Sequence, residues 1–292
     1  MNTLRKIKLV KIIIHLLILV SSLVFIMPMA LVIIVSFTKE EMIGRYGYSL
    51  FPKAWSSAAY SRIFFPGSAV FNSYGITIFV TLAGSLLAVL ITYLAAYPLA
   101  NHDVKYRNGF AMFFFITTVF NSGLVPWYMI CRRFGMYNNI LSLLIPSMIF
   151  TPFNMFLMRN YISTIPRSMM ESARLDGAGD IRTAFQIYLP LCKPILATVC
   201  LFYGINYWNN WFNAVMLLDN KKLYPLQMLL FRIQSDIRML NELTAYGVPV
   251  ATPPNEGFKM ATVVVTIGPL AFLYPFLQRY FVKGIMIGSI KG

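Results

Sequence analysis

The strongest constraint on this chain is the spacing of its charged residues. Marking every Asp, Glu, Lys and Arg leaves six uncharged stretches, at residues 12–38, 63–102, 108–131, 134–158, 194–218 and 260–278. About 20 apolar residues cross a hydrocarbon core as a helix, so each stretch is long enough to span a membrane. The longest stretch holds only one span, roughly 74–97, because Pro66, Gly67, Asn72 and Gly75 interrupt its first part. The sequence therefore predicts an all-α membrane protein with six transmembrane helices.

The composition excludes the main alternatives. The chain is 58% hydrophobic and 12% charged, whereas a soluble domain carries roughly 25% charged residues. Disordered chains are poor in aromatic residues, and 15% of this chain is aromatic. The formal charge of +15 does not indicate nucleic-acid binding, because the basic residues are spread between apolar stretches. Attraction to anionic membrane lipid explains that charge.

The orientation follows from the N-terminal charges. Four Lys and Arg residues lie within the first eleven positions, beside the first span, and such charges favour the cytoplasmic side. The apolar stretch that follows is longer than a signal-peptide core and lacks an A-x-A site, so we expect a retained anchor. With both termini cytoplasmic, residues of about 37–73 and 218–259 are external, and residues of about 159–193 are internal.

The predicted spans carry no chemistry of their own. They contain no carboxylate, and His15 lies near the first membrane edge, so ion coupling, proteolysis and metal catalysis are not expected. Cys131, Cys192 and Cys200 form no C-x-x-C pair and are interpreted as packing residues. The chain also lacks the G-x-x-x-x-G-K-[ST] phosphate-binding loop. If the protein is a pump, a partner ATPase must supply the energy.

The internal segment 166–194 predicts two short helices joined by a sharp bend. Ser168 and Glu171 match a capping box that starts the first helix, although Pro166 in the first turn is an alternative start. Gly177 and Gly179 are expected to end it, because glycine readily adopts the left-handed conformation.

The second helix of this segment is expected to begin at Asp180 as its cap and to end at Pro190. The whole segment resembles the E-A-A loop of ABC importer permeases, whose pattern is E-A-A-x-x-D-G-A followed by I-x-L-P. Ser172 stands at the second position of that pattern, where the family has an alanine. The matching positions are Glu171, Ala173, Asp176, Gly177, Ala178, Ile187, Leu189 and Pro190, and together with Ser172 they are the candidate ATPase-coupling residues.

The resemblance covers most of the chain and points to the MalG-like carbohydrate branch. It is carried by G-Y-S-L-F-P at 47–52, F-N-M-F-L-M-R at 153–159 and N-Y-W-N-N-W-F-N at 206–213. The final twelve residues resemble a subgroup often linked to complex plant or algal oligosaccharides. The implied fold is that of a type I ABC importer permease with a cytoplasmic coupling helix. The implied parts are residues 1–71 (tail, first helix and external loop), 72–281 (permease core) and 282–292 (cytoplasmic tail).

This resemblance implies a non-catalytic permease subunit of an ATP-driven carbohydrate importer in the bacterial cytoplasmic membrane. The coupling helix would rest in a groove of an ATPase dimer, which would bind ATP and Mg, so this chain itself needs no cofactor. A second homologous permease, an extracytoplasmic solute-binding protein and an oligosaccharide cargo are the other implied partners. Two alternatives stay open: an importer for another solute such as a peptide, and a membrane scaffold that recruits an ATPase without transport.

The segment 206–213 holds the candidate cargo residues. Amides there recur at helical spacing and suit sugar hydroxyls, while aromatic rings suit sugar faces. These candidates are Asn206, Tyr207, Trp208, Asn209, Asn210, Trp211 and Asn213. Equally, the amides could join spans by hydrogen bonds and the aromatics could mark the membrane interface. Asn121 and Asn154 are weaker candidates.

Basic residues in the predicted external loops suit an acidic cargo such as a uronate oligosaccharide. They would equally suit an acidic binding protein, or have no specific role. The residues concerned are Lys221, Lys222, Arg232 and Arg238.

Overall fold

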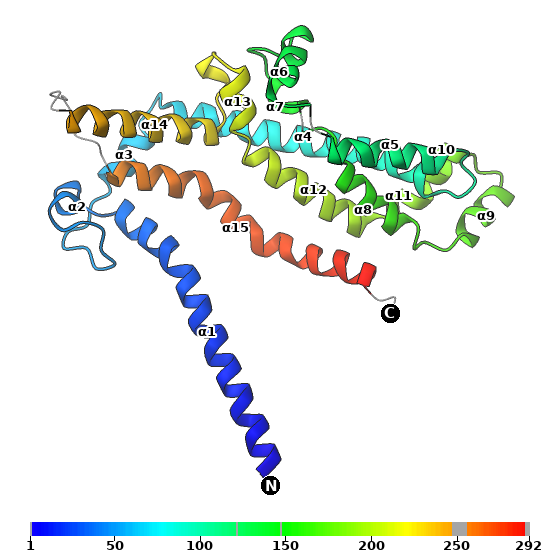
Figure 1. Cartoon of the computed structure of the whole chain (residues 1–292), viewed down its shortest axis with the longest axis horizontal. Coiled ribbons are helices and arrows are strands. Elements are labelled where there is room, and N and C mark those ends of the chain that lie inside the picture. Colours follow the sequence, from blue (N-terminus) through cyan, green and yellow to red (C-terminus); the bar gives the residue numbers. More distant parts are fainter. Residues whose placement is uncertain (1, 121, 147, 247–255, 290–292) are drawn as a thin grey trace. The chain divides into compact units, whose positions relative to one another are not determined.

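The computed structural model describes residues 2–120, 122–146, 148–246 and 256–289, and most of these residues are helical (Figure 1). Within those ranges the only β pairing is an isolated antiparallel bridge between Thr38 and Trp55. The predicted all-α class is therefore confirmed for the described part of the chain.

The chain divides into two compact units, residues 1–68 with 230–268 and residues 69–229 with 269–292. A π-helical turn, η1 (Thr183–Tyr188), and a 3-10 turn, η2 (Lys221–Leu223), accompany the α-helices. The α-helices are α1 (Asn2–Ser36), α2 (Glu40–Tyr46), α3 (Ala58–Ile63), α4 (Ala69–Ala100), α5 (Arg107–Val119), α6 (Leu124–Arg133), α7 (Leu141–Leu144), α8 (Pro152–Ile162), α9 (Ser168–Leu175), α10 (Asp180–Arg182), α11 (Leu189–Leu191), α12 (Lys193–Trp208), α13 (Phe212–Leu217), α14 (Leu226–Ala245) and α15 (Glu256–Ser289).

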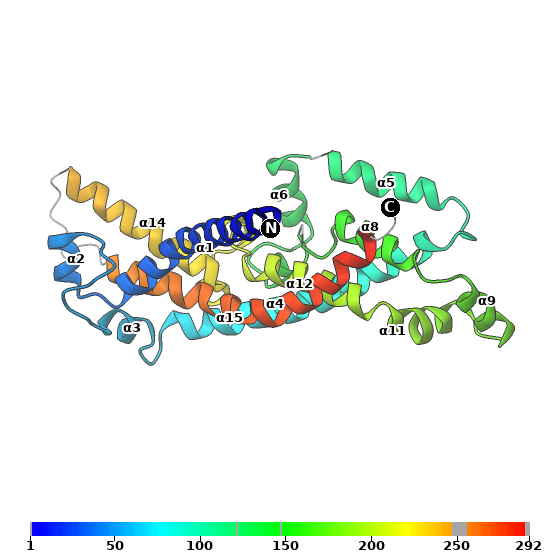
Figure 2. The ribbon, with the colours of Figure 1, turned by 90° about the horizontal axis from the view of Figure 1, so that it is seen from below.

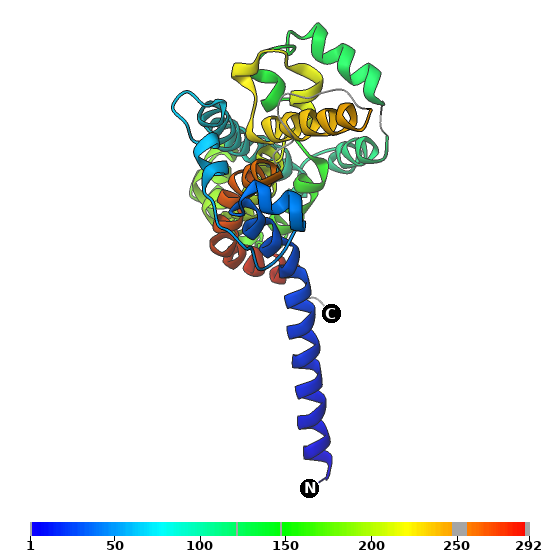
Figure 3. The same cartoon turned by 90° about the vertical axis from the view of Figure 1, so that its left-hand side faces the viewer.

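In the first unit, the part of α1 from Ile12 onward exposes mostly apolar side chains. Figure 3 shows its N-terminal part extending beyond the other helices of this unit. Phe25 is 81% exposed, as expected for a side chain that faces lipid. The start of α15 is capped by the Glu40 carboxylate, which accepts hydrogen bonds from the backbone N–H groups of Glu256 at 2.8 Å and Gly257 at 2.9 Å.

In the second unit, α4 is the central helix and packs against α12 and α8 (Figure 1). Gly84 permits the close approach to α12, because a Cβ there would lie 2.5 Å from the Tyr207 ring. A polar link joins all three helices: Thr92 and Tyr203 share a hydroxyl hydrogen bond of 2.7 Å, and the Tyr203 hydroxyl accepts from the backbone N–H of Thr151 at 3.0 Å. Hydrogen bonds of this kind hold helices together where no water is present.

The first two predicted spans are confirmed as helices long and apolar enough to cross a membrane. They are Val10–Ser36, with 27 residues, and α4, with 32. Two bent pairs also meet the test if each pair is one span, namely α5 with α6, and Asp180–Leu191 with α12. The described residues thus contain two to four candidate spans. Stretch 260–278 lies inside α15.

Three of the uncharged stretches are not the single helices that the sequence predicted. Stretch 108–131 is divided between α5 and α6, and Phe120 between them is extended, with φ −93° and ψ 120°. Stretch 134–158 contains only α7 and the first part of α8, because Thr151 precedes a proline and is extended, with φ −126° and ψ 118°. Stretch 194–218 is interrupted after Trp208, where α12 ends, and the chain resumes as α13. The helical spacing expected across 206–213 is therefore wrong beyond Trp208.

Candidate functional site

The predicted coupling helix is α9, which lies at the same end of the second unit as α11 (Figure 2). Its start differs from the predicted capping box: Arg167 is the N-cap residue, and no side chain caps the helix. Instead, the carbonyl of Pro166 accepts from the backbone N–H of Met169 at 3.2 Å. Neither predicted start is confirmed: Ser168 is the first helical residue, and Pro166 precedes the N-cap Arg167 and so lies outside the first turn.

The end of α9 is a Schellman motif. Gly177 has a left-handed φ of 79°, and its N–H donates to the Arg174 carbonyl at 3.0 Å. The N–H of Ala178 donates to the Ala173 carbonyl at 2.9 Å, which completes the pair of bonds that defines the motif. The predicted stop at Gly177 is confirmed. An added Cβ at Gly177 would meet no atom within 4 Å, so any side chain there is opposed by backbone strain and not by crowding.

One side of α9 is attached to the second unit. Ala173 is buried at 5% exposure, and the guanidinium of Arg174 lies 2.8 Å from the Asp103 carboxylate and 3.6 Å from that of Asp180. The hydrogen bond that Arg174 donates to the Asp103 carboxylate raises the pKa of Arg174 above its usual value. Asp103 follows α4, so Arg174 connects the predicted coupling helix to the end of the central helix.

The other side of α9 presents an exposed apolar and acidic surface. Leu175 is 89% exposed and Met169 is 41% exposed, and Ile181 beyond the bend is 78% exposed. Glu171 and Asp176 are exposed beside them, as are Ser172 and Gly177, while Ala178 is half-buried. Large exposed side chains around a short fixed helix are typical of a protein contact surface.

The second half of the segment runs as one helical stretch from Asp180 to Leu191, followed by an 80° bend into α12. Gly179 is the N-cap, and Asp180 is the first helical residue instead of the predicted cap. The stretch ends at Leu191, one residue after Pro190, so the predicted end at Pro190 is confirmed to within one residue. Ile187 and Leu189 are half-buried and Pro190 is exposed.

Most of the candidate cargo residues in 206–213 form internal contacts. The Asn213 side-chain amide donates to the Pro146 carbonyl at 2.8 Å, and that of Asn210 donates to the Leu143 carbonyl at 3.3 Å. The Tyr207 hydroxyl donates to the Leu144 carbonyl at 2.8 Å. Trp208 is also buried, at 6% exposure. For these residues the contacts favour the alternative interpretation, in which the side chains join segments of the chain.

The remaining members of the segment are accessible. Asn209 donates to the Ile205 carbonyl at 2.9 Å and accepts from the Gln227 amide at 3.0 Å. Trp211 is 43% exposed. Asn206 is exposed and lines an open hollow of about 300 Å³ together with Asn154. Asn121 lies outside the described residues.

A larger hollow, of about 700 Å³, was not predicted from the sequence. Trp127 and Phe212 form its aromatic side, with ring centroids 5.7 Å apart. The indole Nε1 of Trp127 is buried and has no hydrogen-bond partner among the described residues. A buried donor without a partner is costly unless a ligand or water completes it. The lining consists of Thr117, Thr118, Phe120, Ser122, Gly123, Leu124, Trp127 and Phe212.

Comparison with known proteins agrees with this architecture. Residues 4–287 match the family described as "Binding-protein-dependent transport system inner membrane component". The chain belongs to this family. It is 34% identical to Protein LplC of Bacillus subtilis (strain 168) over 91% of this chain and 90% of that protein. It is 32% identical to the polygalacturonan/rhamnogalacturonan transport system permease protein YtcP of the same organism, over 94% and 95% of the two chains.

A solved structure is also similar to this inner membrane component. It is the crystal structure of a bacterial ABC transporter involved in the import of the acidic polysaccharide alginate. The match has a TM-score of 0.82 and 29% sequence identity, and it covers 94% of this chain and 97% of the other. The resemblance to sugar ABC permeases of the MalG-like type is therefore confirmed, and the chain is a transport component of the inner membrane.

For this family member, fixed positions in one short stretch of sequence led to the predicted coupling segment. It missed the 700 Å³ hollow, which joins residues from α5, α6 and α13 that are far apart in the chain. The segment F-N-S-G-L-V-P-W at 120–127 was the available signal, and its separation from Phe212 along the chain hid the contact.

Proposed function

We propose that this chain is the permease subunit of an ATP-driven, binding-protein-dependent importer of oligosaccharide, and that its cargo is acidic. The observation that carries the proposal is α9, a short helix fixed at its end by the Schellman motif and presenting Leu175 outward beside Glu171. The printed names of two similar proteins refer to polygalacturonan/rhamnogalacturonan transport and to import of the acidic polysaccharide alginate, which supports a carbohydrate cargo. The exposed Lys221 and Lys222 support an acidic cargo, because they would attract uronate carboxylates.

The proposed topology has six transmembrane helices with both termini cytoplasmic. Residues 1–71 form the tail, first helix and external loop, residues 72–281 the permease core, and residues 282–292 the second tail. The long apolar helices α1 and α4 and the bent pairs support this division. The partners would be a second permease, a solute-binding protein and an ATPase dimer that binds ATP and Mg, while this chain itself binds no cofactor.

In this mechanism, closure of the ATPase dimer pushes on the exposed side of α9. The contact would be made by Glu171, Ser172, Asp176 and Gly177, while Ile187 and Leu189 hold the segment against the spans. Because Arg174 joins α9 to Asp103 after α4, movement of α9 would be passed to the central helix. This is a two-state element whose balance is set by a ligand bound elsewhere.

The cargo path is proposed to run along the hollow at Trp127 and past Asn206. The aromatic side suits the apolar face of a sugar ring, and the Trp127 indole N–H suits a sugar hydroxyl. The hydroxyls of Thr117 and Thr118 donate to helix carbonyls and can still accept a hydrogen bond. A peptide importer and a non-transporting scaffold are the competing proposals, and cargo uptake separates them from this one.

The test is ATP hydrolysis and uptake of a labelled oligogalacturonide by the complex in liposomes, with cargo-loaded binding protein present. Gly177→Arg is expected to abolish uptake and stimulation of hydrolysis, because a side chain at φ 79° breaks the end of α9. Gly135→Arg is the matched control: Gly135 has φ 69° and open space around it, yet it follows α6.

The control should retain stimulated hydrolysis and uptake. If both variants lose activity equally, backbone strain in general is responsible and the coupling assignment is wrong. If labelled oligogalacturonide is not taken up but a labelled peptide is, the carbohydrate proposal fails while the coupling proposal stands.

A further inference from the structure

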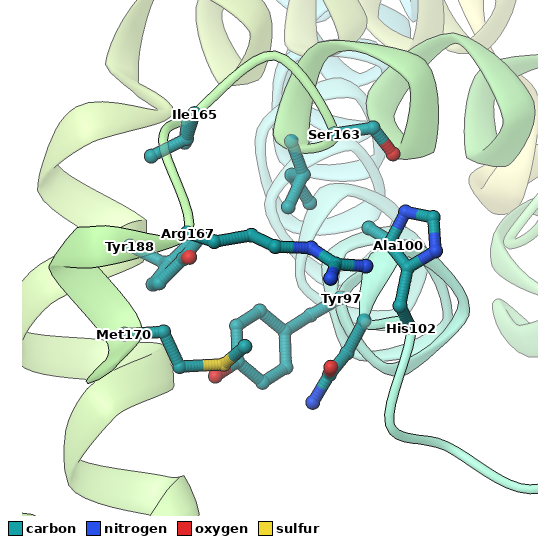
Figure 4. Close-up of a pocket in the computed structure, with 10 residues that line it drawn as sticks. Tyr97, Ala100, His102, Ser163, Ile165, Arg167, Met170 and Tyr188 are labelled. Carbon is teal, nitrogen blue, oxygen red and sulfur yellow. The ribbon is translucent and has the colours of Figure 1, made fainter. Parts of the chain in front are cut away.

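A small notch lies where α4 ends and α9 begins, and nothing in the proposed transport cycle uses it. Its volume is about 50 Å³. One ordered water takes about 10–15 Å³ on this measure, so the notch holds about four water-sized groups. Figure 4 shows the Arg167 side chain reaching across the notch toward His102, and Tyr97 and Tyr188 also line the notch.

The lining of the notch is rich in donors and contains no carboxylate. The side chains of Asn101, His102 and Arg167 supply N–H groups, and Tyr97 and Tyr188 supply hydroxyls. Among the described residues, no carboxylate lies within 4.0 Å of the Arg167 guanidinium. Such a set of groups selects an anion over a cation.

The charges around the notch are predominantly positive. Burial lowers the pKa of His102, and Arg107, Arg167 and Arg159 lower it further, while Asp103 opposes them. Asp103 is itself paired with Arg174 at 2.8 Å, so little of its charge remains to balance the arginines around His102. The local field therefore favours a bound anion.

The position of the notch points to the source of that anion. Ala100, one of its lining residues, is the last residue of α4, an apolar helix long enough to cross a membrane. The end of such a helix lies at the level of lipid headgroups, where basic pockets bind anionic lipid phosphates. A guanidinium also matches the geometry of phosphate oxygens through paired hydrogen bonds.

We propose that this notch binds a phosphate group, supplied by an anionic phospholipid of the same leaflet. The phosphate contacts Arg167 at the start of α9 and His102 just after α4, and so ties the predicted coupling helix to the central helix. Anionic lipid would then hold α9 in the position in which it responds to the ATPase. This consequence rests on the proposed function, whereas phosphate binding itself does not.

The first experiment measures binding without ATP hydrolysis. The full complex in neutral detergent is titrated with short-chain phosphatidylglycerol, short-chain phosphatidylcholine or inorganic phosphate, and bound ligand is counted by native mass spectrometry. Arg167→Gln is expected to weaken phosphatidylglycerol binding about tenfold, as for loss of a charge-assisted hydrogen bond. Arg182→Gln is the matched control, because Arg182 lies in the same segment and bonds Gln186 instead.

Equal binding of phosphatidylglycerol to Arg167→Gln and to the unmodified chain would overturn the proposal, as would equal binding of the two lipids to the unmodified chain. If inorganic phosphate binds through Arg167 and phosphatidylglycerol does not, the phosphate site stands and the lipid source is wrong. Arg167→Lys keeps the charge but loses the paired geometry, so intermediate binding is expected. Normal assembly of the variant complexes excludes misfolding as the cause of weaker lipid binding.

The second experiment compares stimulated hydrolysis in phosphatidylglycerol and phosphatidylcholine liposomes. The unmodified complex and Arg182→Gln should be stimulated more strongly in phosphatidylglycerol, and Arg167→Gln should lose that difference. Lipid dependence that persists in Arg167→Gln would contradict the proposed role of the notch. If hydrolysis by the unmodified complex is not stimulated in either lipid, the result counts against the proposed transport function instead.

Discussion

The segment from α9 to α11 and the segment 206–213 were both selected by their sequence patterns, yet the structure treats them differently. In the first, Glu171, Leu175 and Asp176 are exposed, while Ala173 and Arg174 attach the helix to its unit. In the second, Asn210 and Asn213 are buried and donate to backbone carbonyls of the same chain. The fixed local motif of the first segment therefore indicated an exposed surface. The polar periodicity of 206–213 instead indicated internal hydrogen bonds between segments of the chain.

The physical reason lies in the cost of burying amides. A buried amide must be hydrogen-bonded, so the same side chain serves equally for cargo or for packing. An exposed leucine on a short helix has no such internal use. Four predictions test this contrast, beginning with the largest expected effect.

If the segment 206–213 packs against other segments of the chain, a larger side chain at its contact with α4 should destabilise the protein. Gly84→Ala is expected to lower the free energy of unfolding of the complex by about 3 kcal/mol, because the new Cβ would lie 2.5 Å from the Tyr207 ring. The measurement is chemical denaturation of the detergent-solubilised complex. Gly75→Ala is the control on the same helix, where a Cβ meets nothing within 4 Å. An unchanged free energy of unfolding in Gly84→Ala would contradict the packing interpretation.

The two ends of the amide series should behave differently. Asn213→Ala is expected to lower the free energy of unfolding by about 1–2 kcal/mol, because the Pro146 carbonyl loses its donor in a buried site. Asn206→Ala should leave stability unchanged and reduce oligosaccharide uptake, since Asn206 is exposed beside a hollow. Thermal unfolding and liposome uptake of both variants give the comparison. The reverse pattern would restore Asn213 as a cargo residue.

The hollow that the sequence did not reveal should respond to loss of one donor. Trp127→Phe keeps the ring contact with Phe212 but removes the indole N–H, which has no internal partner. Stability should not fall, and uptake of a labelled oligogalacturonide should decrease about threefold to tenfold, as for one hydrogen bond. Unchanged uptake together with lower stability would show that the N–H serves the fold.

The smallest effect is expected at the attachment of α9. Arg174→Gln removes the contacts with Asp103 and Asp180 and should reduce stimulated hydrolysis by no more than about fivefold, because these ion pairs are exposed to solvent. High salt should lower the stimulated hydrolysis of the unmodified complex toward that of the variant, since salt screens exposed ion pairs. A complete loss of stimulation in Arg174→Gln would make this contact, and not the outward surface, the main coupling element.

The sequence by itself determined the all-α class, the first two long apolar helices and the bend at Gly177. Each depends on local properties: an uncharged run long enough to cross a membrane, or a backbone angle that favours glycine. Family membership was likewise predicted from fixed positions such as Glu171 and Gly177 in one short segment.

Only the tertiary structure decided where polar side chains find their partners. Asn213 bonds a carbonyl 67 positions away, and Trp127 meets Phe212 across a similar separation. The breaks at Thr151 and after Trp208 were also decided there, because uncharged runs are equally compatible with one helix or two. Hydrogen bonding and packing between distant segments leave no local periodicity, so no pattern along the chain can predict them.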